Sequence, residues 1–155
     1  MINRLLNWLD ASTCNVMAVE TIKKELDKVG FAELRQTDKW EIRKGGKYYV
    51  TKNGTAIFAF VLGAEPVAEQ GFRIISAHSD SPCFKIKDNA ELPDQNFLRL
   101  SVEKYGGMLC STWLDRPLSI AGRVLVETEN GIESKLVNLD KDLMMIPNVA
   151  IHMNR

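Results

Sequence analysis

The sequence predicts a mixed α/β fold, with the start of an α/β sandwich in the first half and a β-rich second half. Apolar residues with helical spacing over residues 16–29 predict one long amphipathic helix. Two runs, 55–62 and 73–78, are apolar on both faces, which is typical of strands inside a covered sheet. No helical pattern occurs over 82–140. A helix beside buried strands therefore precedes a region of strands alone, which places the sandwich in the first half.

Two helices are expected near the N-terminus. The first is short, and four side chains form its apolar face: Leu5, Leu6, Trp8 and Leu9. The second can be capped by a side-chain oxygen of Ser12, Thr13 or Asn15, because such oxygens accept from the unpaired N–H groups of a first turn. Gly30 is expected to end this helix in a left-handed conformation, with Phe31 folding back over the last turn.

Two Asn-Gly pairs predict tight β-hairpins, because both residues tolerate positive φ. The first pair, at positions 53 and 54, joins segments 47–52 and 55–62. The second, at positions 130 and 131, joins segments 119–127 and 132–139. The two hairpins lie in different halves of the chain.

Alternating apolar and polar residues predict half-exposed strands at 84–87 and 97–103. The character of the sequence changes here, from covered strands to half-exposed ones. We therefore place a domain boundary at this point, with residues 1–86 in the α/β domain and residues 87–155 in the β-rich domain.

The composition indicates an ordinary globular chain. Its 155 residues are 45% hydrophobic and 26% charged, which fits one domain or two small ones. Twenty basic residues balance twenty acidic ones, so no nucleic-acid surface is expected. The three cysteines, Cys14, Cys83 and Cys110, form no metal or disulfide pattern. Signal-peptide and membrane-spanning patterns are also missing from the sequence, and we expect a cytoplasmic protein without a membrane partner.

The first candidate functional residues are His78, which ends the apolar run 73–78, and Asp80 two positions later. In a strand these two side chains project to the same face. A metal-binding imidazole needs an acceptor on its second ring nitrogen, which a nearby carboxylate supplies. The alternative interpretation is an ordinary polar strand end. A third interpretation takes Cys83 as a nucleophile with His78 as its base.

Two further segments carry unusual residues. Residues 104–116 contain paired glycines, Trp113 and the adjacent charges Asp115 and Arg116. They indicate either a glycine turn with a core tryptophan and a surface ion pair, or a packed loop at a subunit contact. The C-terminal segment contains His152, which by itself is a polar residue at the end of an element. Its apolar character predicts a chain that is cut before its natural end.

Three segments taken together resemble the aspartyl aminopeptidase (aminopeptidase I) family of zinc metallopeptidases. They are Ala77-His78-Ser79-Asp80-Ser81-Pro82-Cys83, the stretch from Tyr105-Gly106-Gly107 through Thr112-Trp113-Leu114-Asp115-Arg116 to Val124, and Ile146-Pro147-Asn148-Val149-Ala150-Ile151-His152-Met153-Asn154-Arg155. The early hairpin at 46–54 is also similar to the family's. The resemblance covers nearly the whole chain.

This resemblance implies a peptidase with two zinc ions that removes acidic or other residues from peptide N-termini. His78 would be a zinc ligand, and Asp80 the catalytic-site carboxylate that orients it or the metal site. His152 would bind substrate and can reach a neighbouring subunit's active site. The implied fold is an α/β/α sandwich interrupted by a β-rich dimerisation domain, in oligomers built from dimers.

The family's remaining metal ligands and its general base are expected beyond the end of this chain. One histidine and one aspartate cannot hold two zinc ions, since each ion takes about four ligands. We therefore expect the 155-residue chain to be inactive alone and to bind zinc weakly or not at all. The alternative is a non-catalytic, truncated module that assembles through its β-rich half.

Overall fold

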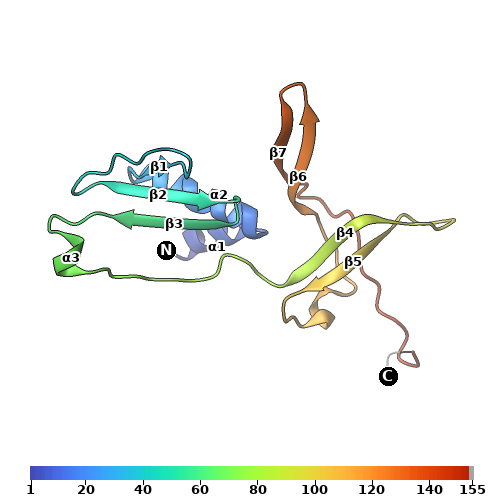
Figure 1. Cartoon of the computed structure of the whole chain (residues 1–155). Coiled ribbons are helices and arrows are strands. Elements are labelled where there is room, and N and C mark those ends of the chain that lie inside the picture. The colour runs from blue at the N-terminus through green and yellow to red at the C-terminus, as the bar shows by residue number, and fades with distance from the viewer. Residues whose placement is uncertain (154–155) are drawn as a thin grey trace. The chain divides into compact units, whose positions relative to one another are not determined.

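The structure is a computed structural model of the chain and describes residues 1–153 (Figure 1). It consists of two compact units. Unit 1 contains Met1–Asp80 and Ala121–Val137, and unit 2 contains Ser81–Ile120 and Asn138–Arg155. Both helices and strands are present, so the expected mixed α/β class is confirmed. Among the described helices, none is both long enough and apolar enough to cross a membrane.

Unit 1 begins with the two predicted helices, α1 (Ile2–Ala11) and α2 (Asn15–Lys28). The expected side-chain cap of α2 is wrong, because Cys14 occupies the N-cap position and makes no side-chain capping bond. Asn15 lies inside the first turn, where its Oδ1 accepts from the Val16 N–H at 2.8 Å. The helix is therefore held by its apolar face, of which Val16 and Val19 are buried.

The C-terminus of α2 ends as the sequence predicts. Gly30 has a φ of +81°, in the left-handed region that glycine adopts without steric cost. The Phe31 N–H donates to the Leu26 carbonyl and the Gly30 N–H donates to the Asp27 carbonyl, both at 3.1 Å. This pair of bonds is the Schellman motif, and it turns the chain back toward the sheet.

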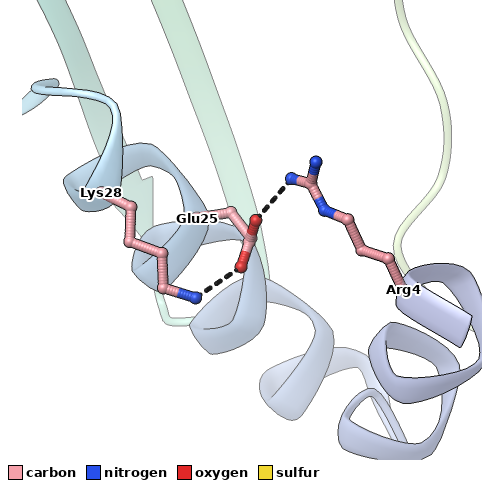
Figure 2. A network of polar contacts seen from close by, with 3 residues as sticks. All are labelled: Arg4, Glu25 and Lys28. Atoms are coloured by element: carbon pink, nitrogen blue, oxygen red, sulfur yellow. Dashed lines mark hydrogen bonds and ion pairs between the residues drawn. The ribbon is translucent and has the colours of Figure 1, made fainter. Parts of the chain in front are cut away.

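A charged network joins α1 to α2 (Figure 2). The Glu25 carboxylate accepts from Arg4 Nη2 and from Lys28 Nζ, each at 2.7 Å. These contacts, first the hydrogen bond from Lys28 and then that from Arg4, hold the pKa of Glu25 below its usual range. All three groups meet solvent, so the network orients the short helix more than it stabilises the unit.

Three strands form the sheet of unit 1: β1 (Ala32–Leu34), β2 (Lys47–Lys52) and β3 (Ala56–Val61). The predicted hairpin of β2 and β3 is confirmed, with φ of 54° at Asn53 and 66° at Gly54. Strand β1 pairs in parallel with β2 and was not expected from the sequence. The buried Tyr49 hydroxyl donates to Asp27 Oδ1 at 2.9 Å, which ties the sheet to α2.

The covered sheet interior that the sequence predicts is not seen within residues 1–153. Strand β3 lies at the edge of the sheet, and Phe58 and Val61 on it are exposed. Residues 73–78 form no strand within the described chain, and Figure 1 shows them without an arrow. Ile75 is 100% exposed. An apolar run becomes a strand only where neighbours bond its backbone, and β1–β3 do not pair with this run.

The second predicted hairpin, β6 (Ala121–Thr128) and β7 (Gly131–Asn138), is confirmed and belongs to unit 1. The turn itself consists of Glu129 and Asn130, and Gly131, the first residue of β7, has a φ of +108°. Arg123 on β6 donates to the Asn53 carbonyl at the tip of the first hairpin. One arginine thus connects the two hairpin segments.

Unit 2 is built on the antiparallel pair β4 (Cys83–Leu92) and β5 (Arg99–Tyr105), which confirms the two half-exposed strands. Their register shifts between Ile86 and Glu91. A single 3₁₀ turn, η1 (Cys110–Trp113), corrects the expectation of no helical segment in this region. The Trp113 ring meets Phe84 edge-on, with centroids 5.5 Å apart, and so packs η1 against β4.

In unit 1 the one-turn helix α3 (Val67–Gln70) lies within the long loop that precedes the extended segment 73–78. A second constraint on that segment comes from Ser79, whose hydroxyl donates to the Thr55 carbonyl at 3.0 Å. The residues around position 79 are therefore held beside the β2–β3 turn, which positions the candidate site described next.

Candidate metal site

The imidazole of His78 is held by the residue two positions further along the chain. Its Nδ1 lies 2.9 Å from the Asp80 carbonyl oxygen and 3.0 Å from Asp80 Oδ1. The His78 side chain is 82% exposed and the Asp80 side chain 39% exposed. In place of the expected strand end, residues 73–78 are extended and have no strand partner among residues 1–153, yet the His78 and Asp80 side chains still meet.

This geometry determines which ring nitrogen can bind a ligand. With two oxygen acceptors beside Nδ1, the neutral ring carries its proton on Nδ1 and leaves the Nε2 lone pair free of that proton. An outward Nε2 with a carboxylate behind Nδ1 is the arrangement seen in zinc-bound histidines. An exposed histidine in a polar turn has the same arrangement, so the geometry permits metal binding without requiring it.

The donor set does not fit a complete zinc site. Over residues 1–153 there is no group of three or more His, Cys, Asp or Glu side chains able to hold a metal ion. Zinc takes about four ligands, or three and a water. His78 and Asp80 therefore supply at most part of a site, and no step of a metal-assisted reaction follows from the described residues.

His152 lies in the other unit. It is exposed and occupies a turn in which the Met153 N–H donates to the Ala150 carbonyl at 2.8 Å. His78 and Asp80 belong to unit 1, whereas His152 belongs to unit 2. Of the three site residues predicted from the sequence, His78 and Asp80 contact each other within unit 1, and His152 belongs to unit 2.

A second arrangement was missed from the sequence. The Asp115 N–H donates to the Ile146 carbonyl at 3.0 Å, and Asp115 Oδ1 accepts from the Asn148 N–H at 2.8 Å. A surface ion pair between Asp115 and Arg116 was one of two interpretations of this segment, and the two side chains have other partners: Arg116 Nη1 lies 3.5 Å from the Thr112 carbonyl. Asp115 instead joins the segment after Trp113 to the segment that carries His152.

Comparison with known proteins identifies the family. A family model described as "Aminopeptidase I zinc metalloprotease (M18)" matches residues 8–155. A "Probable M18 family aminopeptidase 2" of Clostridium novyi (strain NT) is 53% identical over 156 residues, covering 99% of this chain and 36% of its own length. A similar relative in Clostridium acetobutylicum is 46% identical and is covered over 36% of its length.

Solved structures agree with this result. Ape4, from a structure of its complex with Nbr1, superposes with a TM-score of 0.89 at 38% identity, over 96% of this chain and 30% of that one. The S. cerevisiae mApe1 dodecamer gives a TM-score of 0.87 at 30% identity, over 97% of this chain and 36% of that one.

The fold and the matches first define a class: this is a mixed α/β protein of the metallopeptidases. The family is equally clear, because the family model spans nearly the whole chain. The chain belongs to the M18 family of aminopeptidases. It spans about a third of the length of the curated relatives it matches.

Proposed function

We propose that this chain forms the N-terminal portion of a zinc-dependent aminopeptidase that hydrolyses acidic residues from the N-termini of peptides. The observation that carries the proposal is the family match over residues 8–155, which includes both His78 and His152. The preference for acidic residues rests on the resemblance to aspartyl aminopeptidases in the three segments described above.

The proposal gives each site residue a role. His78 is a zinc ligand through Nε2, and Asp80 is the catalytic-site carboxylate that orients the imidazole, as its 3.0 Å contact with Nδ1 favours. His152 binds substrate. The complete site holds two zinc ions, with its other ligands and the general base in parts of the relatives beyond the matched third. The 155-residue chain is therefore inactive by itself and binds zinc weakly or not at all.

The architecture of the complete protein is part of the same proposal. Residues 1–86 begin an α/β/α sandwich, and residues 87–155 form part of a β-rich dimerisation domain. The protein acts on peptides in the cytoplasm as a homo-oligomer. The dodecameric mApe1 relative supports assembly, and so does the exposed apolar edge of β3, since unpaired edges favour pairing with another strand.

One alternative function has an observation in its favour. The chain is a non-catalytic assembly module if its β-rich half binds other copies without a complete active site. That half exposes large apolar side chains, among them Phe97 at 74% and Leu98 at 80%. Exposed apolar surface of this kind is typical of association sites.

A chimera tests the enzymatic proposal directly. In it, this chain replaces the matching third of the Clostridium novyi relative, and hydrolysis of an aspartyl reporter is measured with added zinc. We expect the chimera to be active and the chain alone to be inactive. His78→Ala should lower kcat/KM of the chimera by about 100-fold or more, since loss of a metal ligand disables the site. An inactive but well-folded and oligomeric chimera favours the assembly module.

A matched variant distinguishes chemistry from folding. Lys39→Ala changes an exposed side chain outside all helices and strands, and should leave kcat/KM within about twofold. If Lys39→Ala and His78→Ala reduce activity equally, His78 has no specific role and the proposed site is wrong.

A further inference from the structure

In unit 2, backbone hydrogen bonds join residues 143–146, which precede His152, to residues 114–118, which follow η1. The Leu118 N–H donates to the Met144 carbonyl at 2.9 Å, and the Leu143 N–H donates to the Leu118 carbonyl at 3.0 Å. A parallel bridge then joins Leu114 to Ile146. These backbone contacts reach Ile146 and end there, six residues before His152.

Asp115 extends the contact beyond that bridge. Its φ is 53°, a left-handed conformation that aspartate tolerates better than most residues. Its N–H donates to the Ile146 carbonyl, and its carboxylate accepts from the Asn148 N–H at 2.8 Å. A hydrogen bond with an ionised acceptor is shorter and stronger than a neutral one. Asp115 therefore holds the C-terminal segment at two residues, Ile146 and Asn148.

Local bonds continue from Asn148 to His152. The Asn148 side-chain Oδ1 accepts from the Val149 N–H at 2.9 Å, and the Ala150 carbonyl accepts from the Met153 N–H at 2.8 Å. These two bonds constrain the backbone between Asn148 and Met153, so its path depends on where Asn148 is held. His152 itself is exposed, so the position of its imidazole depends on this backbone path.

We propose that Asp115 is a positioning residue, which fixes the path of residues 146–152 through its double contact with Ile146 and Asn148 and so places His152 for substrate. The claim that His152 is placed for substrate rests on the proposed function. The claim that Asp115 fixes the backbone path of residues 146–152 is independent of it. Asp115 is exposed, so loss of its carboxylate changes the 146–152 segment much more than it changes the stability of unit 2.

Three substitutions separate the side chain from the backbone conformation. Asp115→Asn retains a side-chain oxygen and tolerance of positive φ. Asp115→Gly retains only the tolerance of positive φ, and Asp115→Ala retains neither. Hydrogen exchange is measured at the Asn148 amide in the 155-residue chain, with the Leu118 amide as the internal reference because it bonds Met144 independently of the carboxylate.

We expect Asn148 exchange to be about tenfold faster in Asp115→Gly, and within about threefold of the parent chain in Asp115→Asn. The Leu118 amide should keep its parental rate in both variants. Equal Asn148 rates in the parent chain and Asp115→Gly would overturn the proposal. So would equal acceleration of both amides, since Asp115 would then support the whole unit.

Kinetics of the chimera test the link to substrate. Asp115→Gly should raise KM by about 3- to 10-fold with kcat within twofold, and Asp115→Asn should restore KM. If Asp115→Gly speeds Asn148 exchange but leaves KM unchanged, the claim that Asp115 positions His152 for substrate binding is wrong. An unchanged KM in His152→Ala overturns the role of His152 in the proposed function, and the exchange data still decide the Asp115 contact.

Discussion

At the scale of single residues, the properties of the candidate site follow from one contact. Both acceptors of His78 Nδ1 come from Asp80, one from its backbone and one from its carboxylate. The carbonyl holds the ring even when the carboxylate is removed, and the carboxylate adds a negative charge behind it. Asp80 can therefore bias the tautomer of His78.

A first prediction concerns the tautomer of His78. At a pH where the ring is neutral, nitrogen-15 NMR should find the proton on Nδ1, because two oxygens lie within 3.0 Å of that atom. Asp80→Ala should keep a partial preference for Nδ1–H through the retained backbone carbonyl. His152 is the internal comparison in the same spectrum. A neutral His78 with its proton on Nε2 contradicts this geometry.

The contact between His78 and Asp80 could be predicted from the sequence, whereas the contact between Asp115 and Asn148 could not. The difference lies in how far apart the two residues of each pair are along the chain. Residues two positions apart meet through local backbone geometry alone. Asp115 and Asn148 are 33 positions apart. Their contact depends on the left-handed conformation of Asp115 and on the bridge between Leu114 and Ile146. Neither condition leaves a periodic pattern in the sequence.

At the scale of elements, local chemistry determined which predictions succeeded. The two Asn-Gly hairpins and the Gly30 helix end depend on positive φ over one or two residues, and all three are present. The strand predicted at 73–78 depends on neighbouring strands for its hydrogen bonds. Within the described residues no strand pairs with it, and its isoleucines remain exposed.

The contact between β2 and α2 gives a prediction about pH. Burial first, and then the hydrogen bond to Asp27, raises the pKa of Tyr49 above its ordinary value near 10. The unfolded chain therefore ionises this tyrosine at a lower pH than the folded chain does. Tyr49 stabilises the fold fully below pH 10, and its contribution falls as the pH rises further.

Tyr49→Phe should lower the free energy of unfolding by about 1.5–3 kcal/mol at pH 8, because one hydrogen bond to a charged acceptor is lost. The difference between parent and variant should shrink above pH 10, where only the parent chain can ionise residue 49 on unfolding. Urea denaturation at pH 8 and at about pH 11 measures both values. A difference that is constant or growing over this range contradicts the account.

At the scale of the whole molecule, the site residues are distributed over two units. His78 and Asp80 lie in unit 1 and His152 in unit 2, and the metal ligands that the described residues supply are too few for zinc. The family could be inferred from the sequence because three separate segments matched together. The division into residues 1–86 and residues 87–155 remains a prediction.

The central claim is that His78 is one ligand of a zinc site that this chain only begins. Zinc content measured by atomic absorption after extensive dialysis tests it most directly, in the chain alone, in the chimera and in the chimera with His78→Ala. We predict about two zinc ions per chimera, about one or fewer after His78→Ala, and close to none in the chain alone. Stoichiometric zinc in the chain alone, or two ions retained after His78→Ala, would contradict the account.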